Sequence, residues 1–235
     1  MPNGTFFITG TDTGVGKTVL TALLARHLRN SGVAVAALKP VCSGDREDGR
    51  TLYRVLNGTL TLDEINPWYF RAPLAPVLAA RRDRKCVKLA HVLVHVRSIR
   101  ERFEVVLVEG AGGLLSPLGH DFNARDLIAA LRATPIVVCP NRVGAVNQAL
   151  LVMEALPRAA AKCAQLVLMS APRPDSASRT NARLLAEFLG AKRVHLFPRL
   201  AAAGRMEHAL ASVPARRVLS ALLGGCKACQ EHVNH

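Results

Sequence analysis

The stretch Gly10-Thr11-Asp12-Thr13-Gly14-Val15-Gly16-Lys17-Thr18 decides how this chain folds. It follows a short apolar run, residues 5–9, and precedes a segment with helical apolar periodicity, Val19 to Leu28. A strand, a glycine-bearing loop and a helix in this order are the context of the phosphate-binding pattern G-x-x-x-x-G-K-[ST], here with Gly10 and Gly16 as its glycines. The sequence therefore predicts a site for a nucleoside triphosphate.

The residues of this loop have separate roles in such a site. Gly14 and Gly16 let the backbone curl so that its N–H groups face phosphate oxygens, and the helix that follows adds its positive end. Lys17 is expected to reach the β- and γ-phosphates, and the Thr18 hydroxyl is expected to bind Mg²⁺. Val15 and Val19 complete the predicted nucleotide-binding segment. The alternative is an ordinary glycine-rich turn between a strand and a helix.

Length and composition limit the possibilities. The chain has 235 residues, which predicts one domain over residues 1–225, followed by a short tail over 226–235. The formal net charge is +14, but aromatic residues make up only 4 % of the chain, so the stacking platforms of single-strand binders are missing. We interpret the charge as a solvated, arginine-rich surface and expect no nucleic-acid partner. No apolar run reaches the ~18 residues of a membrane span, and we expect a cytoplasmic protein.

Continuous apolar runs alternate with helical patterns along the chain. The runs fall at residues 33–38, 105–108, 135–139, 166–169 and 194–197, with helical patterns near 89–101, 124–131, 145–156 and 178–189. Runs of this kind are typical of strands covered on both faces. The alternation predicts an α/β fold, a single P-loop-type domain with a parallel sheet and helices on both faces. Four of the six cysteines, Cys42, Cys86, Cys139 and Cys163, stand singly among apolar neighbours and are expected to be reduced and mostly buried.

Polar residues stand where the predicted strands end, and ligands bind at that edge of such sheets. Glu109-Gly110-Ala111-Gly112-Gly113 follows the run at 105–108, where P-loop enzymes place a carboxylate near Mg²⁺. Its glycines would let the backbone approach the γ-phosphate; the alternative is a tight turn. Lys39 ends another run, and a second lysine would balance charge on a transferring phosphoryl group. The alternative for Lys39 is a surface cation.

Several motifs together resemble one family. They are Gly10–Thr18, Lys39-Pro40-Val41-Cys42-Ser43-Gly44, Asn66-Pro67-Trp68-Tyr69-Phe70, Val108–Gly113 and the segment Gly144–Leu150. In this order they resemble dethiobiotin synthetase, over residues 5–200. The resemblance implies an ATP- and Mg²⁺-dependent cyclo-ligase of biotin biosynthesis. One amine of 7,8-diaminononanoate would take up CO₂ as a carbamate, whose oxygen attacks the γ-phosphate. The other amine would then close a cyclic urea and expel phosphate.

The resemblance also implies roles for individual residues. Lys17 and Lys39 would stabilise phosphoryl transfer, and Thr18, Asp48 and Glu109 would hold Mg²⁺, with Asp45 and Glu47 as neighbouring alternatives to Asp48. Thr13, Ser43 and Gly112 would contact the diamine and the carbamate. Val143, Gly144 and Asn147 would bind the carboxylate of the substrate from the neighbouring subunit of a homodimer. The nucleotide set would include Gly110, Ala111, Ser170, Ala171, Pro198, Arg199 and Leu200.

Two features depart from the family pattern or stand outside it. Ser170 occupies a position where the family usually has an asparagine that reads adenine, which predicts weak base discrimination. The tail carries Cys226, Cys229, His232 and His235, which could bind zinc but stand closer together than in a zinc finger.

Two other functions stay open. One is a related P-loop amidoligase, which would normally need a glutaminase domain. The other is a partitioning-type ATPase with a basic DNA-binding surface, but its extra lysine early in the loop is missing at residues 11–13.

Overall fold

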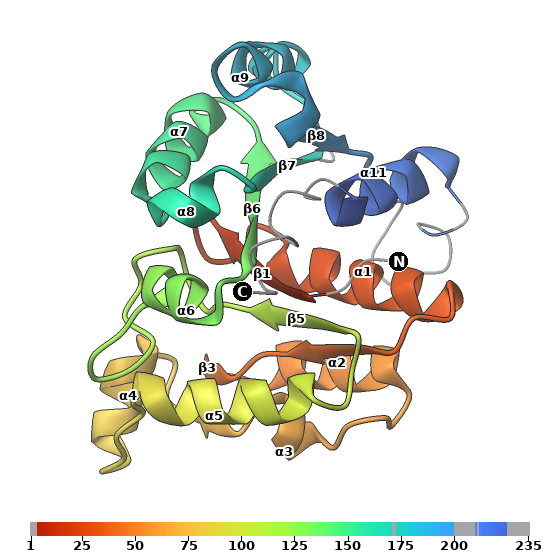
Figure 1. Ribbon diagram of the computed structural model, residues 1–235. Coiled ribbons are helices and arrows are strands. Elements are labelled where there is room, and N and C mark those ends of the chain that lie inside the picture. Colours follow the sequence, from red (N-terminus) through yellow and green to blue (C-terminus); the bar gives the residue numbers. More distant parts are fainter. Residues whose placement is uncertain (1–3, 171–172, 200–209, 211, 225–235) are drawn as a thin grey trace.

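The computed structural model describes residues 4–170, 173–199, 210 and 212–224. Its centre is a six-stranded parallel sheet with the strand order β2-β5-β1-β6-β7-β8 (Figure 1). The strands are β1 (Gly4–Gly10), β2 (Val35–Leu38), β5 (Val105–Glu109), β6 (Thr134–Asn141), β7 (Gln165–Ser170) and β8 (Val194–Phe197). β1 lies between β5 and β6, so the phosphate-binding loop that follows β1 has a later strand on each side.

The strands are the continuous apolar runs of the sequence. In β5 every residue is buried, because helices cover both faces of the sheet. The connection from β1 to β2 crosses the sheet in one direction, and the connections between the later strands cross it in the opposite direction. Because crossovers between parallel strands are right-handed, the two directions place their helices on opposite faces of the sheet. The parallel sheet and its covering helices were predicted from the sequence and are confirmed.

Helices on the two faces form the outer layers (Figure 1). One face carries α1 (Lys17–Asn30), α2 (Glu47–Leu56) and α11 (Val213–Gly224). The other carries α5 (Leu89–Arg100), α6 (Ala124–Leu131), α7 (Ala145–Ala155), α8 (Arg158–Ala161) and α9 (Asn181–Leu189). Short 3₁₀ turns, η1 (Ala177–Arg179) and η2 (Ala191–Arg193), flank α9, so the helix expected at 178–189 is divided.

A small second sheet lies beside the phosphate-binding edge and was not predicted. Its two parallel strands are β3 (Val41–Ser43) and β4 (Trp68–Phe70), with Val41 opposite Trp68. The segment around them also contains α3 (Leu62–Ile65) and α4 (Pro76–Arg82). Thr61 begins α3 with a capping box, in which its hydroxyl accepts from the Glu64 N–H and its own N–H donates to the Glu64 carboxylate.

Some expectations fail or stay predictions. Cys42, Cys86 and Cys139 are free thiols, and all four singly placed cysteines except Cys86 are buried, as expected. Cys163 is disulfide-bonded rather than reduced. No helix among the described residues is both long and apolar enough to cross a membrane. The tail at 226–235, with its cysteines and histidines, lies outside the described residues, and the domain boundary at 225 stays a prediction.

Candidate active site

The loop between β1 and α1 has the backbone geometry that phosphate binding needs. Gly14 and Gly16 adopt φ angles of 73° and 101°, values that side chains rarely tolerate, and Gly16 caps the start of α1. The Nζ of Lys17 donates to the carbonyl oxygen of Asp12 at 2.7 Å and so lies folded over the loop. The assignment of Gly10 to the pattern is wrong by one position. It ends β1, and the place of the first glycine falls on Thr11, whose N–H donates to the Val138 carbonyl.

The buried Lys39 lies at the centre of a charge cluster. Its Nζ is 2.6 Å from Oε1 of Glu109 and 2.7 Å from Oδ2 of Asp48. The Thr18 hydroxyl donates to the same Glu109 oxygen at 2.6 Å. The turn after β2, the end of β5, and the first turns of α1 and α2 thus bring these residues together. The alternative interpretation of Lys39, a surface cation, is wrong, because its side chain is only 4 % exposed.

The charges in this cluster shift one another's ionisation. Burial, and to a smaller extent the nearby Lys39 ammonium, lower the pKa of Lys17 to about 8, although the neighbouring carboxylates act in the opposite direction. Burial alone would lower the pKa of Lys39 too, but the carboxylates of Glu109 and Asp48 raise it above its ordinary value. Burial would raise the pKa of Asp48, and Lys39 overcomes this and lowers it. Lys39 therefore keeps its positive charge, whereas the pKa of Lys17, about 8, lies well below the ordinary value for a lysine.

The same cluster offers oxygen ligands that suit Mg²⁺. The second oxygen of Glu109, Oε2, is buried and has no hydrogen-bond partner among the described residues. Together with the Asp48 carboxylate and the Thr18 hydroxyl, it gives a small set of hard donors, which suits an ion that keeps several waters. Among the residues with described positions, no group of three or more His, Cys, Asp and Glu gathers as a closed metal site.

A cavity of about 720 Å³ opens over this cluster. Most of the predicted site residues line it: Thr13, Gly14, Gly16, Lys17, Thr18, Val19, Lys39, Ser43, Asp48, Glu109, Ala111 and Gly112. Gly112, at φ 69°, has no room for a side chain, because a Cβ would lie 2.5 Å from the Ser116 hydroxyl oxygen. Asp45, one of the two alternatives to Asp48, also lines the cavity, but only Asp48 binds Lys39.

Other predicted residues do not line this cavity. Val15 is buried in the core, and Gly110 packs behind the cavity against Phe7. The Ser170 hydroxyl donates to the Phe197 carbonyl at 2.7 Å, which occupies its donor. Pro198 and Arg199 also lie outside the cavity lining, and Ala171 and Leu200 lie outside the described residues.

The loop before α7 lies apart from the cavity as well. Val143 is exposed, and its N–H donates to the Asp175 carboxylate at 2.7 Å. Gly144 adopts a φ of 85° at the start of α7, and Asn147 is exposed one turn later. Within one chain the structure does not bring these residues to the phosphate-binding loop.

Sequence reasoning missed part of the cavity wall. Cys42, Ser116 and the segment Pro73-Leu74-Ala75-Pro76 line it. The Ser43 hydroxyl donates to the Leu74 carbonyl at 2.6 Å, which holds this segment over the cavity. The two prolines of this segment could have indicated it in the sequence, because they mark a rigid turn soon after the Asn66–Phe70 motif.

Asn66 is a buried residue that positions Lys39. Its Nδ2 donates to the Lys39 carbonyl at 2.7 Å, and its Oδ1 accepts from Arg46 at 3.1 Å. The Lys39 N–H donates to the Ile65 carbonyl. The backbone of Lys39 is therefore fixed from both sides by the segment that leads into β4.

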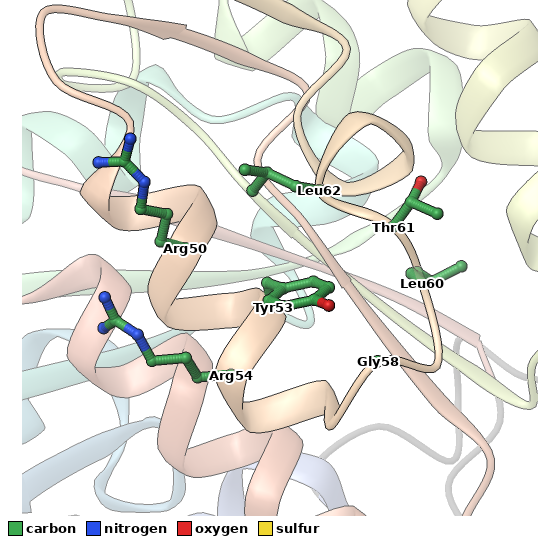
Figure 2. A pocket seen from close by; sticks show the side chains of 7 residues that line it. All are labelled: Arg50, Tyr53, Arg54, Gly58, Leu60, Thr61 and Leu62. Atoms are coloured by element: carbon green, nitrogen blue, oxygen red, sulfur yellow. The ribbon is translucent and has the colours of Figure 1, made fainter.

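Another hollow, beside α2, lacks convergent polar groups (Figure 2). Figure 2 shows Tyr53 facing the segment Leu60–Leu62, while Arg50 and Arg54 extend away from it. The Arg54 guanidinium binds Glu47 at 2.6 Å, and Thr61 serves the capping box of α3. These polar groups already serve local structure.

Comparison with known proteins agrees with this geometry. A family model described as an AAA domain matches residues 4–219. A protein of Anaeromyxobacter dehalogenans, named ATP-dependent dethiobiotin synthetase BioD, is 38 % identical over 217 residues, which cover 90 % of this chain and 97 % of that protein. Proteins of the same name from Rhodococcus erythropolis and Bacillus subtilis are 41 % and 34 % identical, over 82 % and 83 % of this chain and 87 % of each relative.

Solved structures with similar folds are more distant. The MinD cell division protein of Aquifex aeolicus has a TM-score of 0.58 and 15 % identity, and covers 99 % of this chain and 97 % of its own. A ParA family ATPase of Chlorobium tepidum has a TM-score of 0.52 and 11 % identity, covering 94 % and 91 %. At these identities the likeness concerns the fold alone.

Proposed function

The chain belongs to the family of ATP-dependent dethiobiotin synthetases, and on this premise we propose that its cavity joins 7,8-diaminononanoate and CO₂ at the expense of ATP. The observation that supports this best is the pairing of two lysines with two carboxylates in one cavity. Lys17 folds over a phosphate-binding loop, and Lys39 is buried between Asp48 and Glu109. Such a site can neutralise a transferring phosphoryl group, and its lining, as far as the structure describes it, contains no histidine that could activate a serine, threonine or cysteine as a nucleophile.

The residues act by position and charge. The N–H groups of the loop and the start of α1 hold the phosphates, and Lys17 turns from the Asp12 carbonyl to the γ-phosphate. Lys39, already charged, faces the oxygens on which negative charge grows as the carbamate oxygen attacks phosphorus. Thr13, Ser43 and Gly112 line the same cavity and would hold the diamine and its carbamate. The second amine then attacks the carbamate carbon, and phosphate leaves with the carbamate oxygen.

Mg²⁺ would be held by Thr18, Asp48 and Glu109. When bound, the ion neutralises charge on the β- and γ-phosphates. The unpartnered Oε2 of Glu109 supports this assignment, because a buried carboxylate oxygen without a donor is costly unless a cation or water reaches it.

We also propose a homodimer with a shared site. The loop at Val143, Gly144 and Asn147 suits a carboxylate, since it opens α7 at the positive end of the helix dipole and its Val143 N–H already binds the Asp175 carboxylate. It does not line the cavity of its own chain. Exposed apolar side chains near this loop and on the neighbouring α9, Val143, Leu151, Leu184 and Phe188, support an interface there. We keep a cytoplasmic location as part of the proposal, because the reaction consumes ATP.

The nucleotide preference follows from Ser170. Its hydroxyl is bound to the Phe197 carbonyl, so it offers little to read a base. We expect kcat/KM for ATP to exceed the values for CTP and GTP by less than tenfold; a larger preference would show that other residues read the base.

The proposed function is tested by supplying diaminononanoate, bicarbonate and Mg-ATP and measuring dethiobiotin by mass spectrometry. One dethiobiotin should form for each ATP converted to ADP. ATP hydrolysis without dethiobiotin would contradict the proposal and favour a different P-loop ATPase.

A further inference from the structure

A second cavity, of about 270 Å³, lies at the edge of the main sheet opposite the phosphate-binding loop. Thr5, near the beginning of β1, lines it together with residues at the ends of α5 and α6, which lie side by side (Figure 1). Val96 and Leu131 form apolar parts of its wall, and Arg97, Arg100 and Arg132 are its charged residues. The proposed reaction uses none of these residues.

The three arginines have no counter-charge in the described part of the chain. Their guanidinium groups make no ion pair or hydrogen bond with another described residue. Arg97 and Arg132 are exposed and Arg100 is half-buried, so water screens their mutual repulsion, but three positive charges beside one small cavity favour an anion there. Arginine clusters are the usual protein partners of phosphate oxygens, which they bind with paired N–H donors.

Thr5 adds a polar group that lacks a partner. The residue is 7 % exposed, and its hydroxyl oxygen is buried without a hydrogen bond to any described residue. A buried hydroxyl without a partner costs free energy unless a ligand or water completes it. Thr5 lines the cavity although its hydroxyl oxygen is covered, so a rotation of the side chain would bring the hydroxyl to a bound oxyanion, which would provide the acceptor that it lacks.

The backbone at Arg132 makes an arginine there unusual. Arg132 ends α6 with a φ of 50° and a ψ of 38°, the left-handed conformation in which glycine or asparagine is favoured. Basic residues at the end of a helix also complement its dipole, which accounts for Arg97 and Arg100 in the last turn of α5. The same effect applies to Arg132 at the end of α6. It does not explain the unpartnered hydroxyl of Thr5.

We propose that this cavity binds a small phosphate-type oxyanion, held by Arg97, Arg100 and Arg132, with Thr5 as an additional donor. The ligand is either inorganic phosphate or the phosphate group of a small phosphomonoester, since the volume leaves room for little more. Part of the large positive charge of the chain then belongs to a ligand site rather than to a solvated surface.

Isothermal titration calorimetry with inorganic phosphate tests the proposal. The protein is first saturated with Mg²⁺ and a non-hydrolysable ATP analogue, so that the phosphate-binding loop is occupied. Arg132→Gly removes one guanidinium and suits the left-handed backbone, so the variant is expected to fold. Arg84 is the matched control, because it is exposed, has a φ of 54° and does not line the cavity. A second test variant, Arg100→Ala, removes charge without changing a left-handed position.

The unmodified protein should bind one phosphate, and Arg132→Gly and Arg100→Ala should each weaken binding at least tenfold. Arg84→Gly should bind as the unmodified protein does, and Arg132→Gly should retain its synthetase turnover within twofold. Glycerol phosphate in a parallel titration distinguishes a phosphomonoester from free phosphate. The proposal would be overturned if the protein saturated with the ATP analogue bound no phosphate. It would also be overturned if Arg132→Gly and Arg84→Gly lost phosphate affinity equally.

Discussion

Lys39 and Glu109 form a buried ion pair between the turn that follows β2 and the end of β5, with 2.6 Å between Nζ and Oε1. Their side chains are 4 % and 0 % exposed. The β2–β5 pairing brings the two residues together, because Leu38 lies opposite Val108 in the register and Lys39 and Glu109 are the residues that follow them in the chain. The sheet itself therefore holds an ammonium group at the point where the proposed phosphoryl transfer takes place.

Replacing Lys39 by alanine should lower kcat by about 100- to 1000-fold, the usual loss when one preorganised charge is removed from a transition state. Nucleotide binding should largely persist, because the loop and Lys17 remain. Steady-state kinetics and nucleotide titration measure the two effects, with Lys85→Ala, an exposed lysine, as the control. An unchanged kcat in Lys39→Ala would remove this residue from the mechanism.

Asn66→Ala tests whether backbone positioning of Lys39 matters. The change leaves the buried Lys39 carbonyl without its donor, so we expect a loss of about 1–3 kcal/mol in the free energy of unfolding. We also expect kcat to fall at least tenfold with little change in KM for ATP. Urea unfolding and kinetics provide the two measurements, and Asn30→Ala, at the exposed end of α1, is the matched control. A stability loss without any loss of kcat would make Asn66 purely structural.

The lowered pKa of Lys17 makes ATP binding depend on pH. In the free protein this pKa is about 8, and a bound γ-phosphate favours the charged form, so nucleotide affinity should fall as the pH rises above 8. The unfolded chain holds this proton up to the ordinary pKa of 10.5, so Lys17 should contribute increasing stability between pH 8 and 10.5 in the ATP-free protein.

Calorimetry in buffers of different ionisation enthalpy measures the proton taken up on binding. Uptake should peak above pH 8 and disappear in Lys17→Met. Affinity that stays constant from pH 7 to 9.5 would contradict the lowered pKa.

The shared site predicts complementation between two inactive variants. Lys39→Ala damages the phosphoryl-transfer side, and Asn147→Trp damages the loop that we assign to the neighbouring subunit. Asn147 is preferable to Gly144, whose φ of 85° would strain any side chain. After subunit exchange, each mixed dimer should show about half the activity of an unmodified dimer, because one of its two sites is then intact. Verified mixed dimers without activity would mean that each chain completes its own site.

Much of the fold could be predicted because its strands are continuous apolar runs. Val105–Val108 is buried on both faces and therefore shows no alternation that could suggest another structure. The short strands β3 and β4 were missed, because three residues give too short a pattern to separate a strand from a loop. Their pairing depends on contacts between segments far apart in the sequence, which local patterns do not report.

The site divides in the same way. Lys17, Thr18 and Glu109 could be predicted because their chemistry follows directly from a strand or loop motif. The ion pairs of Lys39 could not, since they depend on how β2, β5 and α2 meet. Leu74 and Ala75 carry no chemical signal, and only the Ser43 hydroxyl bond shows why they reach the cavity.

The most direct test of the central claim, attack of the carbamate oxygen on the γ-phosphate, follows an oxygen isotope. A single turnover is run with ¹⁸O-labelled CO₂ before the label exchanges with water, and the released phosphate is analysed by mass spectrometry. Because phosphate leaves with the carbamate oxygen, the account predicts one ¹⁸O in each phosphate that accompanies a dethiobiotin. Unlabelled phosphate formed together with dethiobiotin, from substrate shown to retain its label, would contradict it.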